Sequence, residues 1–540
     1  MTAPLTGRLT ALVLALLLGS VGELALAQVP QAVPQAVPQA APQAAPQAAP
    51  QGAPPARPGQ SAPASEGQSS RSDRATSAHR LPADAASEHA LELPGRTLRF
   101  KAIAGALPIN DGEGNLQAEI AYTAYLSGTD AAAARPLTFV FNGGPGASSA
   151  YLQLGAMGPW RLPLDNIAPA TPPELIPNPD TWLDFSDLVF VDPVGTGYSH
   201  FVATGEQVRK QFWSVDGDAS SLAVFIRKWI EKYGRQVSPK FIVGESYGGF
   251  RAPKIATALQ SEQGVGVSGL VLISPVLDFA WRGQKAHSPL LWVSRLPSMA
   301  SATRDTKQPF DREVLREVER YASGDYLLDL MRGERDTAAV ERISARVAAL
   351  TGLDAQLVRE LAGRVDLQTF QRELNRRQGL VTSIYDATIT GIDPYPNSRN
   401  SRFSDPFLSA MTAPLTGAAT DLYRNKLGWK VDMPYHLLAS NINGQWDWGR
   451  GRSGPDVVDD LRKLLSGDRN MRILVAHGAS DLVTPYFENQ LIINQLPSYG
   501  SVDRLKLLVY GGGHMFYSRD LSRGAFRADV QRLFAARREE

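Results

Sequence analysis

Ser246 lies within the pattern Gly-Glu-Ser-Tyr-Gly, residues 244–248, which is typical of a nucleophilic serine. The apolar residues 241–243 precede the pattern, so a strand would turn abruptly into a helix and present Ser246 at the apex of the turn. Gly244 and Gly248 carry no Cβ, which lets neighbouring elements approach the turn closely. Because the pattern consists of common residue types, its interpretation depends on the residues that accompany it.

A nucleophilic serine requires a base and a carboxylate that orients this base. In one large class of hydrolases they follow the serine in the order Asp or Glu, then His. Asp481 is the only carboxylate in its loop, and His514 follows it in a glycine-rich loop. His477 also follows an apolar segment and remains an alternative base, but it precedes the acid. The order therefore predicts Ser246, Asp481 and His514 as the catalytic residues.

A second glycine-rich segment, Asn-Gly-Gly-Pro-Gly-Ala-Ser-Ser at residues 142–149, follows the largely apolar residues 136–141. Hydrolases of this class use one backbone N–H directly after the nucleophile and another from a loop after an early strand. We therefore predict that the N–H groups of Tyr247 and Gly144 form an oxyanion hole. Asn-Gly and Pro-Gly are also strong turn signals, so an ordinary turn is the alternative explanation for this segment.

The chain resembles the serine carboxypeptidase family in four segments, residues 142–149, 192–199, 244–248 and 513–515. The segment Asp-Pro-Val-Gly-Thr-Gly-Tyr-Ser at 192–199 is informative, because general esterases and lipases do not usually carry it. The four segments occur in the family's order and span most of residues 95–540. The resemblance implies an α/β-hydrolase fold with a central, mostly parallel sheet and a mainly helical cap insertion. It also implies hydrolysis of C-terminal peptide bonds through an acyl-enzyme.

The resemblance assigns a role to each of these residues. His514 would take the Ser246 proton and return it to the leaving amine, while Asp481 would hold the imidazole. Asn142 and Glu245 match residues that bind the free C-terminal carboxylate of the substrate. Glu245 serves this purpose only when it is protonated, because two carboxylates repel each other. In the family this glutamate shares a proton with a second glutamate, which fits activity at acidic pH.

Ala156 stands at the position where the family carries that second glutamate. Without a neighbouring carboxylate, the pKa of Glu245 is expected to rise less. We therefore predict a weaker carboxylate clamp and a pH optimum less acidic than the family's usual one. The alternative is that another residue, not visible in the sequence, replaces the missing glutamate.

Alternating strands and helices are expected to position these residues. We expect strands at 97–103, 118–126, 136–141, 187–191, 269–274, 471–476 and 505–510, and a helix at 215–233. The alternation stops between about 278 and 466, where amphipathic helices are expected at 311–377. This range is the predicted cap over the active site. Its aromatic residues Trp281, Trp292, Tyr395, Trp446 and Trp448 are possible pocket-lining residues, which leaves the side-chain preference open.

The N-terminal residues 1–27 have the features of a secretory signal peptide. Arg8 precedes an apolar run at 9–18, and Ala25-Leu-Ala27 fits a cleavage site before Gln28. An uncleaved membrane anchor is the alternative, but the run is short for a membrane span. We therefore expect a secreted or periplasmic protein, of bacterial type, with no stable membrane span after cleavage.

Residues 28–86 are predicted to be a disordered linker, and residues 87–540 the catalytic domain. The linker begins with a four-residue repeat, Pro-Gln-Ala-Val or Pro-Gln-Ala-Ala, between residues 30 and 50. A proline at every fourth position prevents a helix and favours extended polyproline II segments. A passive spacer is the simplest interpretation, and tethering to the envelope is the alternative.

Composition restricts the remaining possibilities. The chain of 540 residues has no cysteine, so disulfides, thiolate metal sites and a cysteine nucleophile are excluded. The 55 Lys and Arg against 54 Asp and Glu argue against a nucleic-acid partner. We expect no cofactor and no metal, and peptide or protein C-termini as substrates, with the oligomeric state open. Two other functions remain as alternatives: an acyltransferase or esterase on the same scaffold, and an inactive hydrolase-fold binding protein.

Overall fold

The computed structural model describes residues 80–128, 134–164, 167–282, 285–305, 310–398, 403–449, 451 and 454–536. The predicted signal peptide and the predicted linker up to residue 79 lie outside the described residues. The first described strand begins at Ala85, inside the last two residues of the range predicted as linker. Among the described helices, none combines the length and apolar character that a membrane crossing requires.

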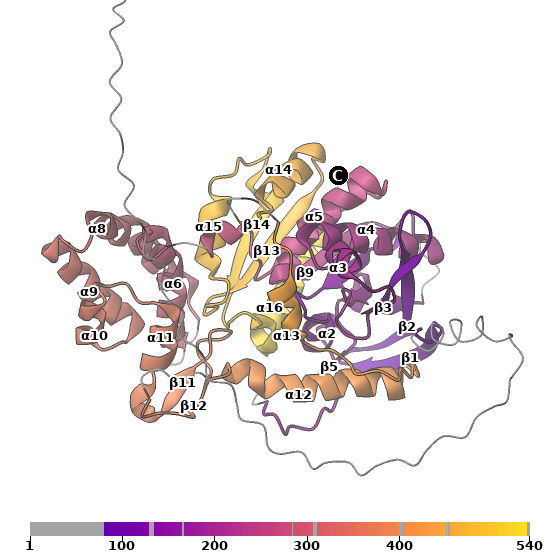
Figure 1. The fold of residues 1–540 in the computed structure, drawn as a ribbon, viewed down its shortest axis with the longest axis horizontal. Coiled ribbons are helices and arrows are strands. Elements are labelled where there is room, and N and C mark those ends of the chain that lie inside the picture. The colour runs from indigo at the N-terminus through magenta and orange to yellow at the C-terminus, as the bar shows by residue number, and fades with distance from the viewer. Residues whose placement is uncertain are drawn as a thin grey trace, which may run out of the picture. The chain divides into compact units, whose positions relative to one another are not determined.

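A mixed sheet forms the centre of the described part of the chain (Figure 1). Its strands, in spatial order, are β1 (Ala85–Leu93), β2 (Arg96–Asn110), β3 (Leu116–Ser127), β7 (Asp187–Val191), β4 (Leu137–Phe141), β9 (Lys240–Glu245), β10 (Gly269–Ile273), β13 (Arg472–Gly478) and β14 (Leu505–Tyr510), with β8 (His200–Phe201) beside β3. The strands from β7 to β14 are parallel, and β1, β2 and β3 pair antiparallel. The predicted α/β-hydrolase fold with a mostly parallel sheet is confirmed.

Helices cover both faces of this sheet, as the almost uniformly apolar central strands require. Within β4, the side chain of Val140 packs in one core, and those of Phe139 and Phe141 pack in the core on the opposite face. The helices α4 (Val215–Lys232), α5 (Tyr247–Glu262) and α14 (Val458–Gly467) contribute to the Phe139 side, and α12 (Pro406–Asp421) and α16 (Asp520–Ala535) to the other. The two-residue period of a strand thus supplies two separate cores.

The predicted helix at 215–233 is present as α4. Ser214 caps it by accepting a hydrogen bond from the Gly217 N–H at 3.2 Å. Its apolar stripe, which includes Phe225 and Trp229, is fully buried against the sheet. Short elements connect the strands before it: α2 (Ala150–Leu152), η2 (Gln153–Met157), β5 (Trp160–Arg161), β6 (Ile176–Pro177), η3 (Trp182–Asp184) and α3 (Glu206–Phe212).

The chain leaves the sheet after β10 and returns to it at β13. In between it forms η4 (Phe279–Trp281), α6 (Pro289–Asp305), α7 (Arg312–Tyr321), η5 (Ala322–Tyr326), α8 (Leu327–Arg332), α9 (Thr337–Thr351), α10 (Ala355–Glu360), α11 (Leu367–Glu373), η6 (Arg376–Gln378), β11 (Leu380–Thr382), β12 (Thr390–Ile392), α12, η7 (Leu422–Lys426), α13 (Ser440–Gln445) and α14. After β13 follow α15 (Tyr486–Ile493), η8 (Val502–Arg504), β14, η9 (Phe516–Ser518) and α16.

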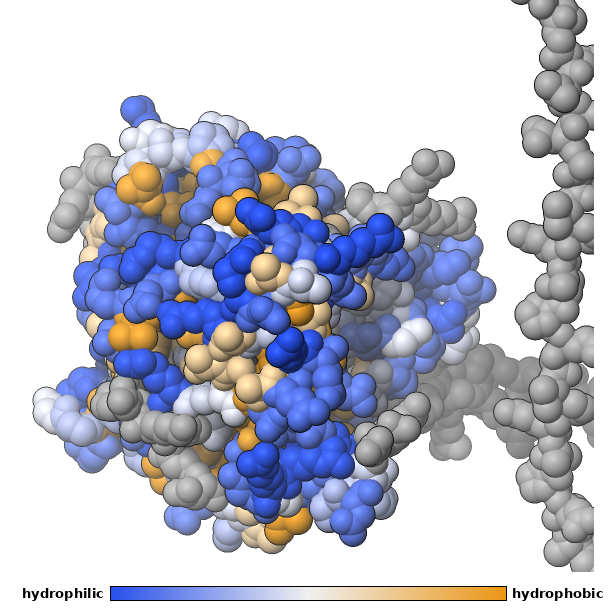
Figure 2. All heavy atoms as spheres, turned by 90° about the vertical axis from the view of Figure 1, so that its left-hand side faces the viewer, coloured by the Kyte–Doolittle hydropathy of each residue, from blue (hydrophilic) through white to orange (hydrophobic). Residues whose placement is uncertain are grey.

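The range predicted as cap, about 278–466, divides among three cores. Helices α6 to α11, which we call the cap, share a core of their own with α15 and lie beside the sheet in Figure 1. Helix α12 packs in the core on one face of the sheet, and α14 in the core on the other. The outer face of the cap is mainly hydrophilic with scattered apolar side chains (Figure 2), as expected for amphipathic helices with one buried side.

Candidate active site

Ser246 occupies the sharp turn that the sequence predicts. Strand β9 ends at Glu245 and helix α5 begins at Tyr247, and Ser246 between them has φ of +60° and ψ of −121°. A left-handed φ is strained for a residue with a Cβ, and such strain is typical of functional turns. Gly244 permits the turn, because a Cβ there would lie 1.9 Å from the Gly248 carbonyl oxygen. The surrounding fold therefore holds the nucleophile in a conformation that an isolated chain would avoid.

Asp481 and His514 meet beyond the ends of the adjacent strands β13 and β14. The His514 Nδ1 lies 2.8 Å from the Asp481 Oδ2, which also accepts a hydrogen bond from the Thr484 hydroxyl at 2.6 Å. The Asp481 Oδ1 accepts hydrogen bonds from the backbone N–H groups of Val483 at 2.8 Å and Thr484 at 2.9 Å. The carboxylate thus has four hydrogen bonds, from three residues, that fix its orientation, and it in turn orients the imidazole.

The electrostatics of this pair favour a charged intermediate. Burial opposes ionisation of Asp481, but its attraction to His514 and its hydrogen bonds hold the pKa of the carboxyl below the usual value. Burial likewise disfavours a protonated His514, but Asp481 outweighs this effect, and the pKa of the imidazole is raised. Asp481 therefore remains an anion and stabilises the imidazolium that forms when His514 accepts a proton.

Ser274, a residue that sequence reasoning missed, joins the loops of the acid and the base. Its hydroxyl donates to the His514 carbonyl oxygen at 2.8 Å, and its own carbonyl oxygen lies 3.0 Å from the Thr484 hydroxyl oxygen. Its φ is +44°, and it is fully buried. Only the strand-to-loop position after β10 hinted at its importance, and that signal does not distinguish it from any other serine at a strand end.

His477, the alternative base, is excluded by its position. It is fully buried, and its Nε2 lies 2.8 Å from the side-chain nitrogen of Asn489. Burial lowers its pKa to about 3. It does not line the cavity that contains Ser246, whereas His514 does. His477 is therefore a structural residue within the core.

One cavity of about 120 Å³, which we call the catalytic cavity, brings most of the predicted site residues together. It is lined by Asn142, Gly143, Gly144, Ala147, Tyr151, Glu245, Ser246, Tyr385, Leu408, Leu438, Val483, His514 and Met515. Asp481 lies behind His514 and is not among them. Tyr385, Leu408 and Leu438 come from the long insertion between β10 and β13, whereas the five aromatic residues that the sequence analysis singled out do not line this cavity.

The predicted oxyanion donors lie at the contact between the glycine-rich loop and the elbow. A Cβ at Gly143 would lie 2.5 Å from the Tyr247 nitrogen, so the loop passes directly against the start of α5. Within the described residues, neither the Gly144 N–H nor the Tyr247 N–H donates a hydrogen bond. The Tyr247 side chain contributes nothing to the cavity, because its ring packs against Trp446 and Trp448 at centroid distances of 5.3 and 5.7 Å.

Arg251 binds the backbone of the glycine-rich loop at residues 142–149, which we call the oxyanion loop. Its Nη1 donates to the Asn142 carbonyl oxygen at 2.6 Å, and its Nε donates to the Asp218 carboxylate at 2.6 Å. Its guanidinium also lies over the Tyr247 ring at 5.0 Å from the centroid. The Arg251 and Asp218 side chains are both buried. A buried, hydrogen-bonded ion pair thus connects α4, α5 and the oxyanion loop, and only the tertiary structure reveals it.

Glu245 and Asn142 form the predicted pair beside the nucleophile. The Asn142 amide nitrogen donates to the Glu245 Oε2, and the Asn142 Oδ1 accepts from the Leu152 N–H at 3.0 Å. The Tyr517 hydroxyl donates to the Glu245 Oε1 at 2.8 Å. Burial raises the pKa of Glu245 to about 7 and outweighs the opposing effects of His514 and these hydrogen bonds. The carboxyl group is therefore neutral in mildly acidic solution.

The absence of a carboxylate at Ala156 has a structural counterpart. Ala156 is buried in η2, and a Cβ on the adjacent Gly155 would lie 3.1 Å from the Tyr517 ring. The aromatic ring of Tyr517 thus lies against this segment, and its hydroxyl donates a hydrogen bond to Glu245. The expectation of a smaller rise in the Glu245 pKa considered only the charge of a second carboxylate. In the structure, burial is the largest cause and needs no second carboxylate.

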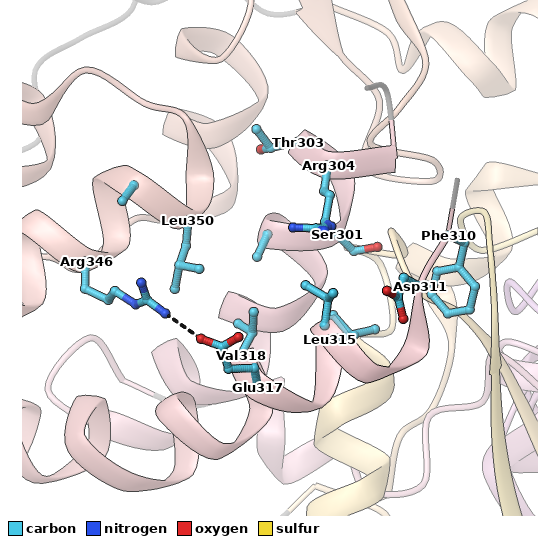
Figure 3. A pocket seen from close by; sticks show the side chains of 13 residues that line it. Ser301, Thr303, Arg304, Phe310, Asp311, Leu315, Glu317, Val318, Arg346 and Leu350 are labelled. Carbon is cyan, nitrogen blue, oxygen red and sulfur yellow. Dashed lines mark hydrogen bonds and ion pairs between the residues drawn. The ribbon is translucent and has the colours of Figure 1, made fainter. Parts of the chain in front are cut away.

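The cap contains a separate cavity of about 410 Å³ (Figure 3). It is lined by Ala300, Ser301, Thr303, Arg304, Phe310, Asp311, Val314, Leu315, Glu317, Val318, Arg346, Ala349 and Leu350, none of which lines the catalytic cavity. Arg346 and Glu317 form an ion pair of 3.1 Å at its edge. Across the described residues, no group of three or more His, Cys, Asp or Glu side chains is placed to hold a metal ion.

Comparisons with known proteins point to one family. Residues 94–304 match the model of a family described as serine carboxypeptidase. The chain is 32% identical over 205 residues to serine carboxypeptidase-like 5 of Arabidopsis thaliana, covering 35% of this chain and 45% of that relative. It is 33% identical over 376 residues to pheromone-processing carboxypeptidase KEX1 of Yarrowia lipolytica, covering 67% of this chain and 52% of the relative. The matches thus span about half the length of these curated relatives.

A solved structure shares the fold. The structure of Kex1(delta)p, a prohormone-processing carboxypeptidase from Saccharomyces cerevisiae, matches with a TM-score of 0.51 and 15% sequence identity. The match covers 80% of this chain and 91% of that chain. At this identity the likeness establishes the common fold.

Proposed function

We propose that this protein, whose residues 94–304 match the serine carboxypeptidase family, removes C-terminal residues from peptides or proteins. The observation that carries the proposal is the position of Glu245 directly before the nucleophile, in the cavity that Ser246, His514 and Asn142 also line. A general hydrolase has no need of a buried carboxyl group there. A neutral carboxyl group beside an amide is suited to bind the free carboxylate of a peptide C-terminus.

The proposed reaction proceeds through a covalent acyl-enzyme. His514 accepts the Ser246 hydroxyl proton through Nε2 as the oxygen attacks the carbonyl carbon of the last peptide bond. The N–H groups of Gly144 and Tyr247 then stabilise the oxyanion, a contribution worth about 3–4 kcal/mol for a single donor in comparable enzymes. His514 returns the proton to the leaving amine. A water molecule then attacks the acyl carbon and gives its proton to His514. His514 returns this proton to the Ser246 oxygen, which releases the shortened peptide.

Protonation of Glu245 connects substrate binding with catalysis. A protonated Glu245 donates a hydrogen bond to the substrate carboxylate, whereas an ionised Glu245 repels it. The ionised form also raises the pKa of His514, which would leave less neutral imidazole to act as the base. Both effects favour the protonated carboxyl group in the productive enzyme.

The test compares three versions of one substrate: a peptide with a free C-terminal carboxylate, its C-terminal amide, and a simple ester. We expect rapid trimming of the free acid, observed by mass spectrometry, and a much lower kcat/KM for the amide. The Ser246→Ala variant is the control for contaminating peptidases. Ester hydrolysis without peptide trimming would instead indicate an esterase or acyltransferase on the same scaffold. No reaction with any substrate would contradict an enzymatic function.

We also propose that the protein is an exported, bacterial-type member of the family. The support is the basic and apolar composition of residues 6–18 and the small residues before Gln28. N-terminal sequencing of the protein recovered from a bacterial host is expected to yield Gln28 as the first residue. A mature protein that retains residues 1–27 would contradict the proposal.

A further inference from the structure

Tyr151 carries a buried hydroxyl group without a partner. The residue follows the oxyanion loop in α2, is 6% exposed and borders the catalytic cavity. Its hydroxyl makes no hydrogen bond to any described residue and has almost no exposed surface. Buried polar groups are nearly always hydrogen-bonded in folded proteins, so an exception at an active site requires an explanation.

The surroundings of this hydroxyl connect it with the carboxylate clamp. Burial raises the pKa of Tyr151, with smaller contributions from Tyr385 and Glu245, so the hydroxyl remains a proton donor throughout the working range of pH. Tyr517, by contrast, already donates its hydroxyl to Glu245 at 2.8 Å. Of these two tyrosine hydroxyls, one therefore has its acceptor within the protein and the other does not.

We propose that Tyr151 is a substrate-binding residue whose hydroxyl donates a hydrogen bond to the C-terminal carboxylate of the peptide. Tyr517 holds Glu245 in place, and Tyr151 adds a hydrogen-bond donor to the pair formed by protonated Glu245 and Asn142. The Asn142 amide nitrogen orients Glu245 from the other side. This inference rests on the proposed carboxypeptidase function. It adds a tyrosine hydroxyl to the residues that bind the substrate carboxylate.

In this cavity, neutral hydrogen-bond donors must bind the missing acceptor. Its lining contains no lysine or arginine, and Glu245 and His514 are its only titratable groups besides tyrosines. Neutral donors in a buried site bind an anion more strongly than a neutral carbonyl, because charge strengthens the hydrogen bond. The rest of the lining is largely apolar, with Leu408, Leu438 and Val483. These side chains suit an uncharged side chain of the substrate and offer its carboxylate no partner.

The Tyr151→Phe variant tests the proposal, measured on the free-acid peptide and its C-terminal amide. We expect kcat/KM on the free acid to fall about 10- to 100-fold, mainly through a higher KM. On the amide the change should stay within about threefold, because the amide carries no charge to bind. The thermal midpoint should be unchanged or higher, since the variant removes a buried donor without a partner. If Tyr151 had only a structural role, the variant would lose activity equally on both substrates and have a lower thermal midpoint.

Tyr499→Phe is the matched control. Its hydroxyl is also buried without a partner among the described residues, but the residue does not line the catalytic cavity. We expect its kinetics on both substrates to match those of the unmodified enzyme. Tyr517→Phe provides a second comparison. It removes a hydrogen bond that lowers the pKa of Glu245, so the fall in free-acid activity should begin at a higher pH, whereas Tyr151→Phe should leave this pH dependence in place.

The outcomes separate the inference from the function on which it rests. If the enzyme prefers free acids and Tyr151→Phe retains the same free-acid to amide ratio, the role of Tyr151 is refuted and the carboxypeptidase function stands. An equal loss on both substrates with a lower thermal midpoint would also refute it, in favour of a packing role. If the unmodified enzyme shows no Ser246-dependent trimming, the proposed function itself fails.

Discussion

The catalytic cavity and the cap cavity are each lined by a glutamate, but the two glutamates have opposite surroundings. In the catalytic cavity, Glu245 is 3% exposed and two side chains donate hydrogen bonds to its carboxyl group. In the cap cavity, the side chains of Glu317 and Arg346 are 63% and 45% exposed and contact each other in one ion pair. Charged groups with several buried partners have a fixed geometry, whereas an exposed pair is screened by water and exchanges partners.

The size of a cavity is therefore a poor guide to function in this protein. The cap cavity has the larger volume, about 410 Å³ against about 120 Å³. Only the smaller one contains a serine with a strained backbone, the Gly144 N–H without an acceptor among the described residues, and a carboxyl group with a shifted pKa. Perturbed titratable groups that converge on a cleft are the better indication of a functional site.

Removal of the Ser246 hydroxyl should have the largest effect on activity and should separate the catalytic cavity from the cap cavity most clearly. We expect Ser246→Ala to lower kcat on every substrate by about 10⁴- to 10⁶-fold, because no other group in the cavity can form the acyl-enzyme. The variant should fold normally and still bind a free-acid peptide, as measured by calorimetry. Residual turnover above about one percent would point to a different nucleophile.

We expect Asp481→Asn to cause the second-largest fall in kcat. The asparagine retains the size of the side chain but places a donor opposite His514 and favours the wrong imidazole tautomer, so kcat is expected to fall by about 10⁴-fold. Stopped assays on an activated ester measure the loss. The substitution should leave KM almost unchanged, since Asp481 does not line the catalytic cavity. A loss of less than tenfold would show that another group orients His514.

Substitutions at Glu245 should have an intermediate, pH-dependent effect. Because its raised pKa is about 7, kcat/KM on a free acid is expected to fall as the pH rises through 7, while the fall on the amide, which has no charge for Glu245 to repel, should be much smaller. Glu245→Gln retains a hydrogen-bond donor without an ionisable group, so it should abolish this fall. Glu245→Ala should lower the free-acid preference about 10- to 100-fold. An identical pH profile for Glu245→Gln and the unmodified enzyme would assign the fall to another group.

The same residue predicts how stability depends on pH. The pKa of Glu245 is raised from 4.5 to about 7 in the folded protein. The folded state thus binds this proton more tightly than the unfolded state, and its contribution to stability is complete below about pH 4.5 and lost by about pH 7. In denaturant titrations, Glu245→Gln should reduce the loss of stability over this window. A larger loss for the variant would contradict the direction of the shift.

The smallest effect is expected in the cap cavity. Arg346→Ala breaks an exposed ion pair, so the free energy of unfolding should change by less than about 1 kcal/mol and kcat/KM by less than about twofold. Glu317→Ala should behave in the same way. A tenfold loss of activity in either variant would show that the cap cavity communicates with Ser246, and would remove the distinction between the two cavities.

Sequence patterns were sufficient where chemistry depends on a short segment. The elbow around Ser246 and the loop around Gly144 each combine a strand end with glycines in a few consecutive residues, and a short pattern records such a turn. The predicted strand at 187–191 coincides with β7. The helical period of apolar residues did not show how residues 278–466 divide among three cores. An amphipathic helix has the same apolar stripe whether it packs on the sheet or on other helices.

The sequence by itself determined the turn that presents Ser246, the order of Asp481 and His514, and the strands that carry them, because each depends on local turn chemistry and on a two-residue apolar period. Only the tertiary structure decided which residues support them. Tyr517 meets Glu245 across 272 positions of the chain, and Ser274 meets His514 across 240. Such contacts leave no periodic trace, and the raised pKa of Glu245 arises from burial, which exists only once the chain has folded.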